Sequence, residues 1–150
     1  MNMTKLTAIG ILNLTIENDI VTCISFADNL TNVPHTPFGI AVFDQIDAYL
    51  SGTITNFDFE YTLVGTNFQQ KVWQAVSQIP YGETASYKEI ATAIGNPNAS
   101  RAVGLANNKN PIPLVIPCHR VIGTNGKLVG YAGGLEAKRY LLEVEGRVII

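Results

Sequence analysis

The residue pattern of the chain changes near Thr66. Before this point, short segments rich in Ile, Val and Thr alternate with turn residues, which is typical of strands. After it, apolar residues recur three and four positions apart in segments that open with helix-capping residues. The change predicts an α+β fold in two domains: a small α/β scaffold over residues 1–64 and a mainly helical domain over 65–150.

The charges divide at the same place. Residues 1–64 hold one basic and seven acidic side chains, whereas residues 65–150 hold nine basic and five acidic ones. This asymmetry favours an anionic partner for the second domain, although ordinary surface variation would also explain it.

The first domain is expected to begin with two strands around a turn, over residues 5–27. A helix is predicted over 38–52, where apolar residues lie on one face and Gly52 ends the pattern. The alternation over 57–63 predicts a further strand. These elements carry no obvious chemistry, so we interpret the domain as scaffold.

Capping boxes mark two helices of the second domain. Thr66 with Gln69 opens a helix that runs to Pro80, and Ser86 with Glu89 opens one that ends at Gly95. A Gly-Asn-Pro turn leads into a third helix over 100–108. Two short helices joined in this way outline a helix-turn-helix, which favours DNA binding, although many helical hairpins do not bind DNA.

The remainder is expected to hold a proline-bounded extended segment, a glycine-rich loop and a final helix. These cover residues 108–123, 124–134 and 135–146, and a short tail, 147–150, follows.

The two cysteines, Cys23 and Cys118, lie too far apart for a metal-ligand spacing or a disulfide framework. We therefore expect a reducing, cytoplasmic compartment. The apolar runs are too short to span a membrane, and the N-terminus does not resemble a signal peptide. Cys23 is interpreted as a packing residue, and His35 as a surface histidine.

The segment "IPCHRVIG" places the thiol of Cys118 beside the imidazole of His119. A cysteine reacts as its thiolate, so a neighbouring base would activate it. Neighbouring residues of an extended segment face opposite ways, and the imidazole would then act through a water or on a bent backbone. Glu143 and Glu145 are both candidates to orient the imidazole. A buried, inert thiol is the alternative, and a thiol hydrolase would need a glycine-rich nucleophile turn that is absent here.

Taken together, these segments resemble the O6-alkylguanine-DNA alkyltransferases, also called methylated-DNA–protein-cysteine methyltransferases. The match runs through "GNPNASRAVGLANNKNPIPLVIPCHRV" and "YAGGLEAKRYLLEVEG" and covers about residues 62–146. The resemblance implies a winged-helix-like helix-turn-helix in the second domain. The first domain resembles the ribonuclease-H-like first domain of the family only in the order of its elements.

The resemblance also implies catalytic roles. Cys118 would accept the alkyl group in a single, irreversible turnover, His119 would take the thiol proton through a water, and Glu145 rather than Glu143 would orient His119. Asn110 would begin the turn that places the active-site segment. Tyr87 would donate to the extruded guanine and press on a flanking phosphate.

Further positions would bind DNA or the base. The helix that starts with Ser100 would enter the minor groove, where Arg101 would fill the gap in the base stack. Its small residues, which include Ala102 and Gly104, would allow close approach. The pocket would be formed by Pro113, Val121, Tyr131, Ala132 and Gly133, with the Cys118 and Val121 carbonyls accepting from the guanine amine and the Ala132 N–H donating to the alkylated oxygen. Lys138 would be structural or would face a phosphate or the solvent.

The function expected is direct repair of O6-alkylguanine, and of O4-alkylthymine as a further substrate, in double-stranded DNA of any sequence. The alternatives are a lesion- or DNA-binding protein without catalysis and a thiol enzyme acting on a small molecule. We expect no cofactor, no zinc or other metal, no membrane and no obligate protein partner, and we expect a monomer. Gly133 predicts tolerance of adducts larger than methyl.

Overall fold

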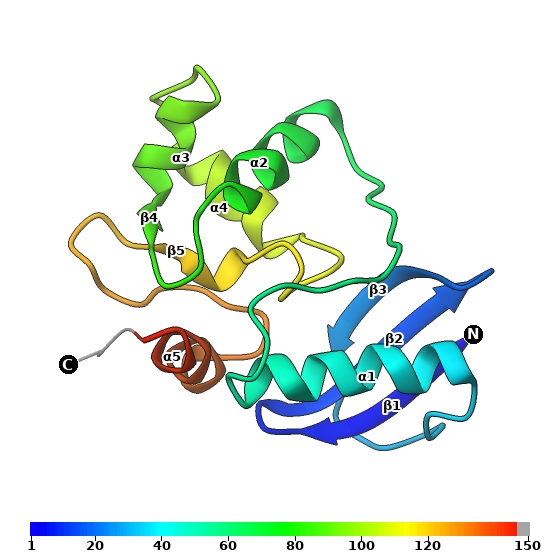
Figure 1. Cartoon of the computed structure of the whole chain (residues 1–150). Helices are drawn as coiled ribbons and strands as arrows, with labels where there is room; N and C mark the ends of the chain where they lie inside the picture. Colours follow the sequence, from blue (N-terminus) through cyan, green and yellow to red (C-terminus); the bar gives the residue numbers. More distant parts are fainter. Residues whose placement is uncertain (147–150) are drawn as a thin grey trace. The chain divides into compact units, whose positions relative to one another are not determined.

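The structure is a computed structural model that describes residues 1–146, so the expected tail at 147–150 lies outside the described residues. The chain forms two compact units, Met1–Leu63 and Val64–Ile150. Both units are drawn in Figure 1, and each is described below by itself. Together they make a mixed α/β protein.

The first unit pairs one helix with one antiparallel sheet. Strands β1 (Asn2–Thr7), β2 (Gly10–Glu17) and β3 (Ile20–Phe26) lie in the order β1-β2-β3, and helix α1 (Pro37–Leu50) follows. Thr36 caps α1 by accepting from the Gly39 N–H. A Cβ atom on Gly39 would collide with the sulfur of Met3, so this glycine lets α1 approach β1 closely.

Two expectations for the first unit were wrong. The segment expected to hold two strands holds three, because the chain turns at residues 8–9 and Gly10 takes a φ of 113°, which favours glycine. No strand forms over 57–63. There, pairing with the sheet is limited to an isolated parallel bridge between Tyr61 and Val21, in which Val21 bonds with the backbone of residues 60 and 62. The rings of Phe57 and Phe59 meet at a tilt, with 5.6 Å between their centroids.

The second unit is built around three helices that contact one another: α2 (Asn67–Ser77), α3 (Tyr87–Ala93) and α4 (Ser100–Asn108). Both predicted capping boxes are present, at Thr66 and at Ser86. The indole of Trp73 is buried and donates to the Ala106 carbonyl at 2.8 Å, which joins α2 to α4. Gly95 has a φ of 82° and ends the α3 segment as expected.

The segment around Cys118 is bent, which corrects the prediction of an extended segment. A 3-10 turn, η1 (Cys118–Arg120), carries the cysteine and leads into β5 (Val121–Ile122), which pairs in parallel with β4 (Ala85–Ser86). Pro117 and a bond from the Cys118 N–H to the Ile116 carbonyl, 2.7 Å long, direct the chain into this turn. The glycine-rich loop and helix α5 (Leu135–Val144) follow.

None of the helices formed by residues 1–146 is long and apolar enough to cross a bilayer.

Candidate active site

Cys118 lies at the start of η1, with 7% of its surface exposed. Asn110 braces the segment before it: its amide donates to the Ile116 carbonyl at 2.8 Å, and its side-chain oxygen accepts from the Ile112 N–H at 3.0 Å. Burial raises the pKa of the Cys118 thiol to about 11, although a hydrogen bond with Asn110 and the charge of Lys138 oppose the rise. The resting side chain is therefore a thiol and needs a base to react.

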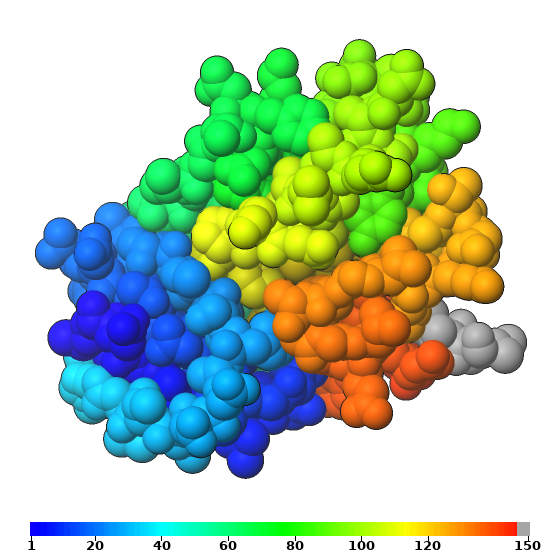
Figure 2. All heavy atoms as spheres, turned by 180° about the vertical axis from the view of Figure 1, so that it is seen from behind, coloured from blue at the N-terminus to red at the C-terminus, as the bar shows by residue number. Residues whose placement is uncertain are grey.

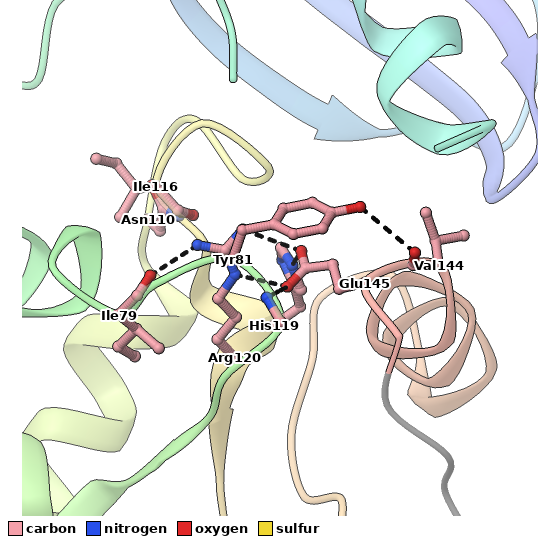
Figure 3. A network of polar contacts seen from close by, with 9 residues as sticks. Ile79, Tyr81, Asn110, Ile116, His119, Arg120, Val144 and Glu145 are labelled. Atoms are coloured by element: carbon pink, nitrogen blue, oxygen red, sulfur yellow. Dashed lines mark hydrogen bonds and ion pairs between the residues drawn. The ribbon is translucent and has the colours of Figure 1, made fainter. Parts of the chain in front are cut away.

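His119 supplies an imidazole in the same turn. Its Nε2 lies 2.6 Å from Oε2 of Glu145, the residue that caps the C-terminus of α5, and both side chains are completely buried. Figure 3 shows the two side chains meeting between η1 and the end of α5. Of the two glutamates considered, Glu145 is thus the one beside the imidazole.

Arg120, to which the sequence analysis gave no role, holds the same carboxylate. Its Nε donates to Glu145 Oε1 at 2.8 Å, its Nη2 donates to Oε2 at 3.1 Å, and its Nη1 donates to the Ile79 carbonyl at 2.8 Å (Figure 3). The guanidinium lies 5.5 Å from the ring centroid of Tyr81. A charged residue within the apolar run around "PCHRV" was the signal that could have identified this partner.

The arrangement assigns the tautomer of His119. A carboxylate that accepts from Arg120 and from the Gly82 N–H is ionised and can only accept, so His119 Nε2 carries the hydrogen. Nδ1 then carries the free lone pair of the ring. It is buried and has no hydrogen-bond partner among residues 1–146. Burial is the largest influence on the pKa of His119 and lowers it; Glu145 opposes this, whereas Arg120 and Lys138 add to it.

Lys138 is fully buried, so it faces neither phosphate nor solvent in this structure, and only its structural interpretation holds. Its ammonium donates to the carbonyls of Val121 at 2.5 Å, Val129 at 2.8 Å and Gly130 at 3.2 Å. Burial lowers its pKa to about 8. Lys138 therefore ties the glycine-rich loop to β5.

Tyr87 begins α3 and is half-buried. Its hydroxyl donates to the Val129 carbonyl at 3.1 Å, and a Cβ atom on Gly104 would lie 3.6 Å from its ring. The tyrosine thus lies between α4 and the glycine-rich loop. Figure 2 shows these two segments side by side on the surface, in yellow-green and orange.

The exposed side of α4 carries Arg101 and Ala102, and Ser100 and Gly104 are partly exposed. A cation and small residues thus share one accessible helix surface. Its first turn includes no acidic side chain, and its N-cap residue, Ala99, makes no side-chain hydrogen bond to cap the helix.

The predicted pocket residues fall into two sets. Pro113 and Val121 are buried, whereas Tyr131, Ala132 and Gly133 lie in the glycine-rich loop and are partly or fully exposed. The two carbonyls expected to receive the guanine amine already accept internal hydrogen bonds. The Cys118 carbonyl accepts from the Val121 N–H and from Asn107 Nδ2, and the Val121 carbonyl accepts from Lys138.

Over the part of the chain that the structure describes, no three His, Cys, Asp or Glu side chains are grouped so that they could hold a metal ion.

Comparison with known proteins gives a consistent match. Residues 67–147 match the model of the family described as 6-O-methylguanine DNA methyltransferase, DNA binding domain. A methylated-DNA–protein-cysteine methyltransferase of Methanosarcina acetivorans is 60% identical over 102 residues, which are 68% of this chain and 65% of the relative. One of Mycolicibacterium paratuberculosis is 48% identical over 145 residues, which are 93% of this chain and 88% of the relative.

A solved structure agrees over nearly the whole chain. The crystal structure of Mycobacterium tuberculosis OGT in complex with DNA is 49% identical, covers 96% of this chain and 91% of that one, and superposes with a TM-score of 0.86. The family model covers more than half of this chain, and the relatives extend the match into the first unit. The chain therefore belongs to the 6-O-methylguanine DNA methyltransferase family.

Proposed function

We propose that this protein repairs O6-alkylguanine in double-stranded DNA by transferring the alkyl group to Cys118 in one irreversible turnover. The observation that carries the proposal is the buried array of Cys118, His119 and Glu145, in which a protonated thiol lies one residue from an imidazole with an accepting Nδ1. Family membership and a relative solved in complex with DNA support the choice of substrate.

The proposed step begins with proton transfer. The Cys118 proton passes to His119 Nδ1 through a bridging water, and the sulfur attacks the alkyl carbon. The S–C bond forms as the C–O6 bond breaks, and the bonding electrons stay on the guanine. Tyr87 donates a proton to the guanine ring, and the proton taken from the thiol replaces it. Glu145 stabilises the imidazolium that forms in between.

DNA binding is assigned to α3 and α4, as a winged-helix-like helix-turn-helix. The reacting carbon lies inside a duplex, so the nucleotide must be flipped out, which costs a few kcal/mol. Arg101 fills the vacated space, while Ser100, Ala102 and Gly104 let the helix enter the minor groove closely. Contacts to the backbone and to the groove shape make the binding independent of sequence.

The base is proposed to bind between the buried Pro113 and Val121 and the loop residues Tyr131, Ala132 and Gly133. The Ala132 N–H donates to O6. Because Asn107 and Lys138 already occupy the Cys118 and Val121 carbonyls, a guanine amine that binds there shares or displaces those donors. We also propose O4-alkylthymine as a substrate. Thymine has no exocyclic amine, so it would leave the bonds of Asn107 and Lys138 to these carbonyls in place.

The two units have different parts in this proposal. Residues 1–64 are a scaffold of ribonuclease-H-like type, and 65–150 form the DNA-binding alkyltransferase domain. The protein acts as a monomer without an obligate protein partner. A cytoplasmic location follows from the DNA substrate and from two cysteines that are both free.

Intact-mass measurement tests this function. Incubation with a duplex that contains one O6-methylguanine should add the mass of one methyl group, and Cys118→Ala should show no gain while still binding the duplex. An unaltered wild-type mass with DNA binding intact would instead select a lesion-binding protein without catalysis. Methyl transfer that persists in Cys118→Ala would exclude this nucleophile.

A further inference from the structure

The side chain of Glu145 is completely buried, and hydrogen-bond donors surround its carboxylate. Arg120 donates through Nε and Nη2, the Gly82 N–H donates at 3.2 Å, and His119 Nε2 is 2.6 Å away. The guanidinium is itself fixed on its other side by the Ile79 carbonyl and by the Tyr81 ring (Figure 3). A two-point contact of this kind sets the orientation of the carboxylate as well as its charge.

A buried carboxylate beside an imidazole creates a difficulty for the proposed reaction. With no other counter-charge, Glu145 would favour the imidazolium form of His119, because opposite charges attract strongly where water is excluded. An imidazolium has hydrogens on both nitrogens and cannot accept a proton from Cys118. The residue that orients the base could therefore also disable it.

We propose that Arg120 is the positioning residue that keeps His119 a competent base, because it neutralises Glu145 and holds the carboxylate where it accepts from His119 Nε2. Arg120 acts through Glu145 and need not touch the substrate. The consequence for catalysis rests on the proposed function, whereas the effect on the protonation of His119 belongs to the free protein.

Every charged group near His119 fits this assignment. Cys118 and Arg120 flank it in η1, and Glu145 contacts it from the end of α5. Lys138 of α5 acts on it through charge, and Tyr81, in the loop after α2, faces the Arg120 guanidinium. Burial lowers the pKa of His119 most, Glu145 raises it, and Arg120 and Lys138 lower it further. Arg120 is the cation bonded directly to the carboxylate that raises this pKa.

The test is an NMR titration of the His119 ring in the free protein, with wild type, Arg120→Met and Arg120→Lys. Methionine keeps much of the apolar stem and removes the charge. We expect the midpoint of His119 in Arg120→Met to rise by at least about one pH unit, a tenfold change in proton affinity. Lysine keeps the charge without the two-point contact, so its midpoint should stay nearer the wild-type value.

Two control variants test whether the shift is specific to Arg120 and whether it depends on the charge of Glu145. Arg139→Met deletes an exposed arginine of α5 and should leave the midpoint unchanged. The double variant Arg120→Met, Glu145→Gln removes both charges and should abolish the upward shift. If Arg120→Met does not fold, Arg120→Gln replaces it in the titration. Glutamine removes the positive charge but keeps an amide NH2 group that can donate to Glu145.

Single-turnover rates on O6-methylguanine duplex then connect the titration to the reaction. The rate of Arg120→Met should follow the neutral fraction of His119. It should fall below wild type as the pH drops through the variant's own His119 midpoint and recover as the pH rises past that midpoint. A His119 midpoint in Arg120→Met that equals or lies below the wild-type value would overturn the proposal, and so would an equal upward shift in the lysine variant. If wild type transfers no alkyl group, the proposed function fails, and the titration still decides the role of Arg120.

Discussion

Burial of Cys118 weakens the acidity of its thiol, and this affects folding as well as reactivity. Its pKa is about 11 in the folded chain, against 9.0 for an unperturbed thiol. Between these values the unfolded chain has already lost the proton that the folded chain keeps. Stability contributed by the thiol is therefore complete below pH 9 and is lost as the pH rises towards 11.

Comparison of wild type with Cys118→Ala measures this contribution. From pH 8 to 10.5, the free energy of unfolding should fall more steeply for wild type than for the variant, as followed by urea denaturation. Lys138, whose pKa burial lowers to about 8, contributes with the opposite sign in both proteins. Parallel curves would show that burial does not hold the proton on Cys118.

Gly104 of helix α4 is expected to matter more for DNA binding than for the stability of the helix. A Cβ atom on Gly104 would lie 3.6 Å from the Tyr87 ring, which is an ordinary contact, and alanine favours helix more than glycine does. Gly104→Ala should therefore fold with unchanged or slightly increased stability. If α4 enters the minor groove closely, the added methyl group should still weaken binding to duplex DNA several-fold.

Fluorescence anisotropy with a labelled duplex, beside thermal unfolding, checks that prediction. Ala41→Ser, a change of similar size at an exposed position of α1 in the first unit, serves as the control. Full DNA affinity in Gly104→Ala would place the close approach elsewhere on the molecule.

The helices could be predicted from the sequence because their ends are encoded locally. The capping boxes at Thr66 and Ser86 and the glycine at position 95 each act within a few residues. The bend at Cys118 could not be predicted in this way. Pro117 is local, but the Ile116 carbonyl, which bonds with the Cys118 N–H, is also held by Asn110, six residues before it. The pairing of Arg120 with Glu145 joins residues 25 apart in sequence, so no local pattern reports it.

For the whole molecule, the distribution of charge limits how DNA can be bound. The acidic first part and the basic second part leave a net charge of −2, so few counterions would be released on binding. We expect weak, sequence-independent affinity with a shallow dependence on salt. Binding to an undamaged duplex, measured from about 50 to 200 mM salt, gives the slope of log binding constant against log salt concentration. A steep slope, like that of a protein with many phosphate contacts, would contradict this prediction.

The depth at which Cys118 lies has a consequence for the time between synthesis and use. A protein that reacts once must still hold an intact sulfur when it meets its lesion. Peroxides and soluble electrophiles attack the thiolate, and they need access to it. Cys118 is 7% exposed and its pKa is raised to about 11, so little of it is thiolate and little of its sulfur is accessible. The burial that makes a base necessary therefore also protects the unused protein from inactivation.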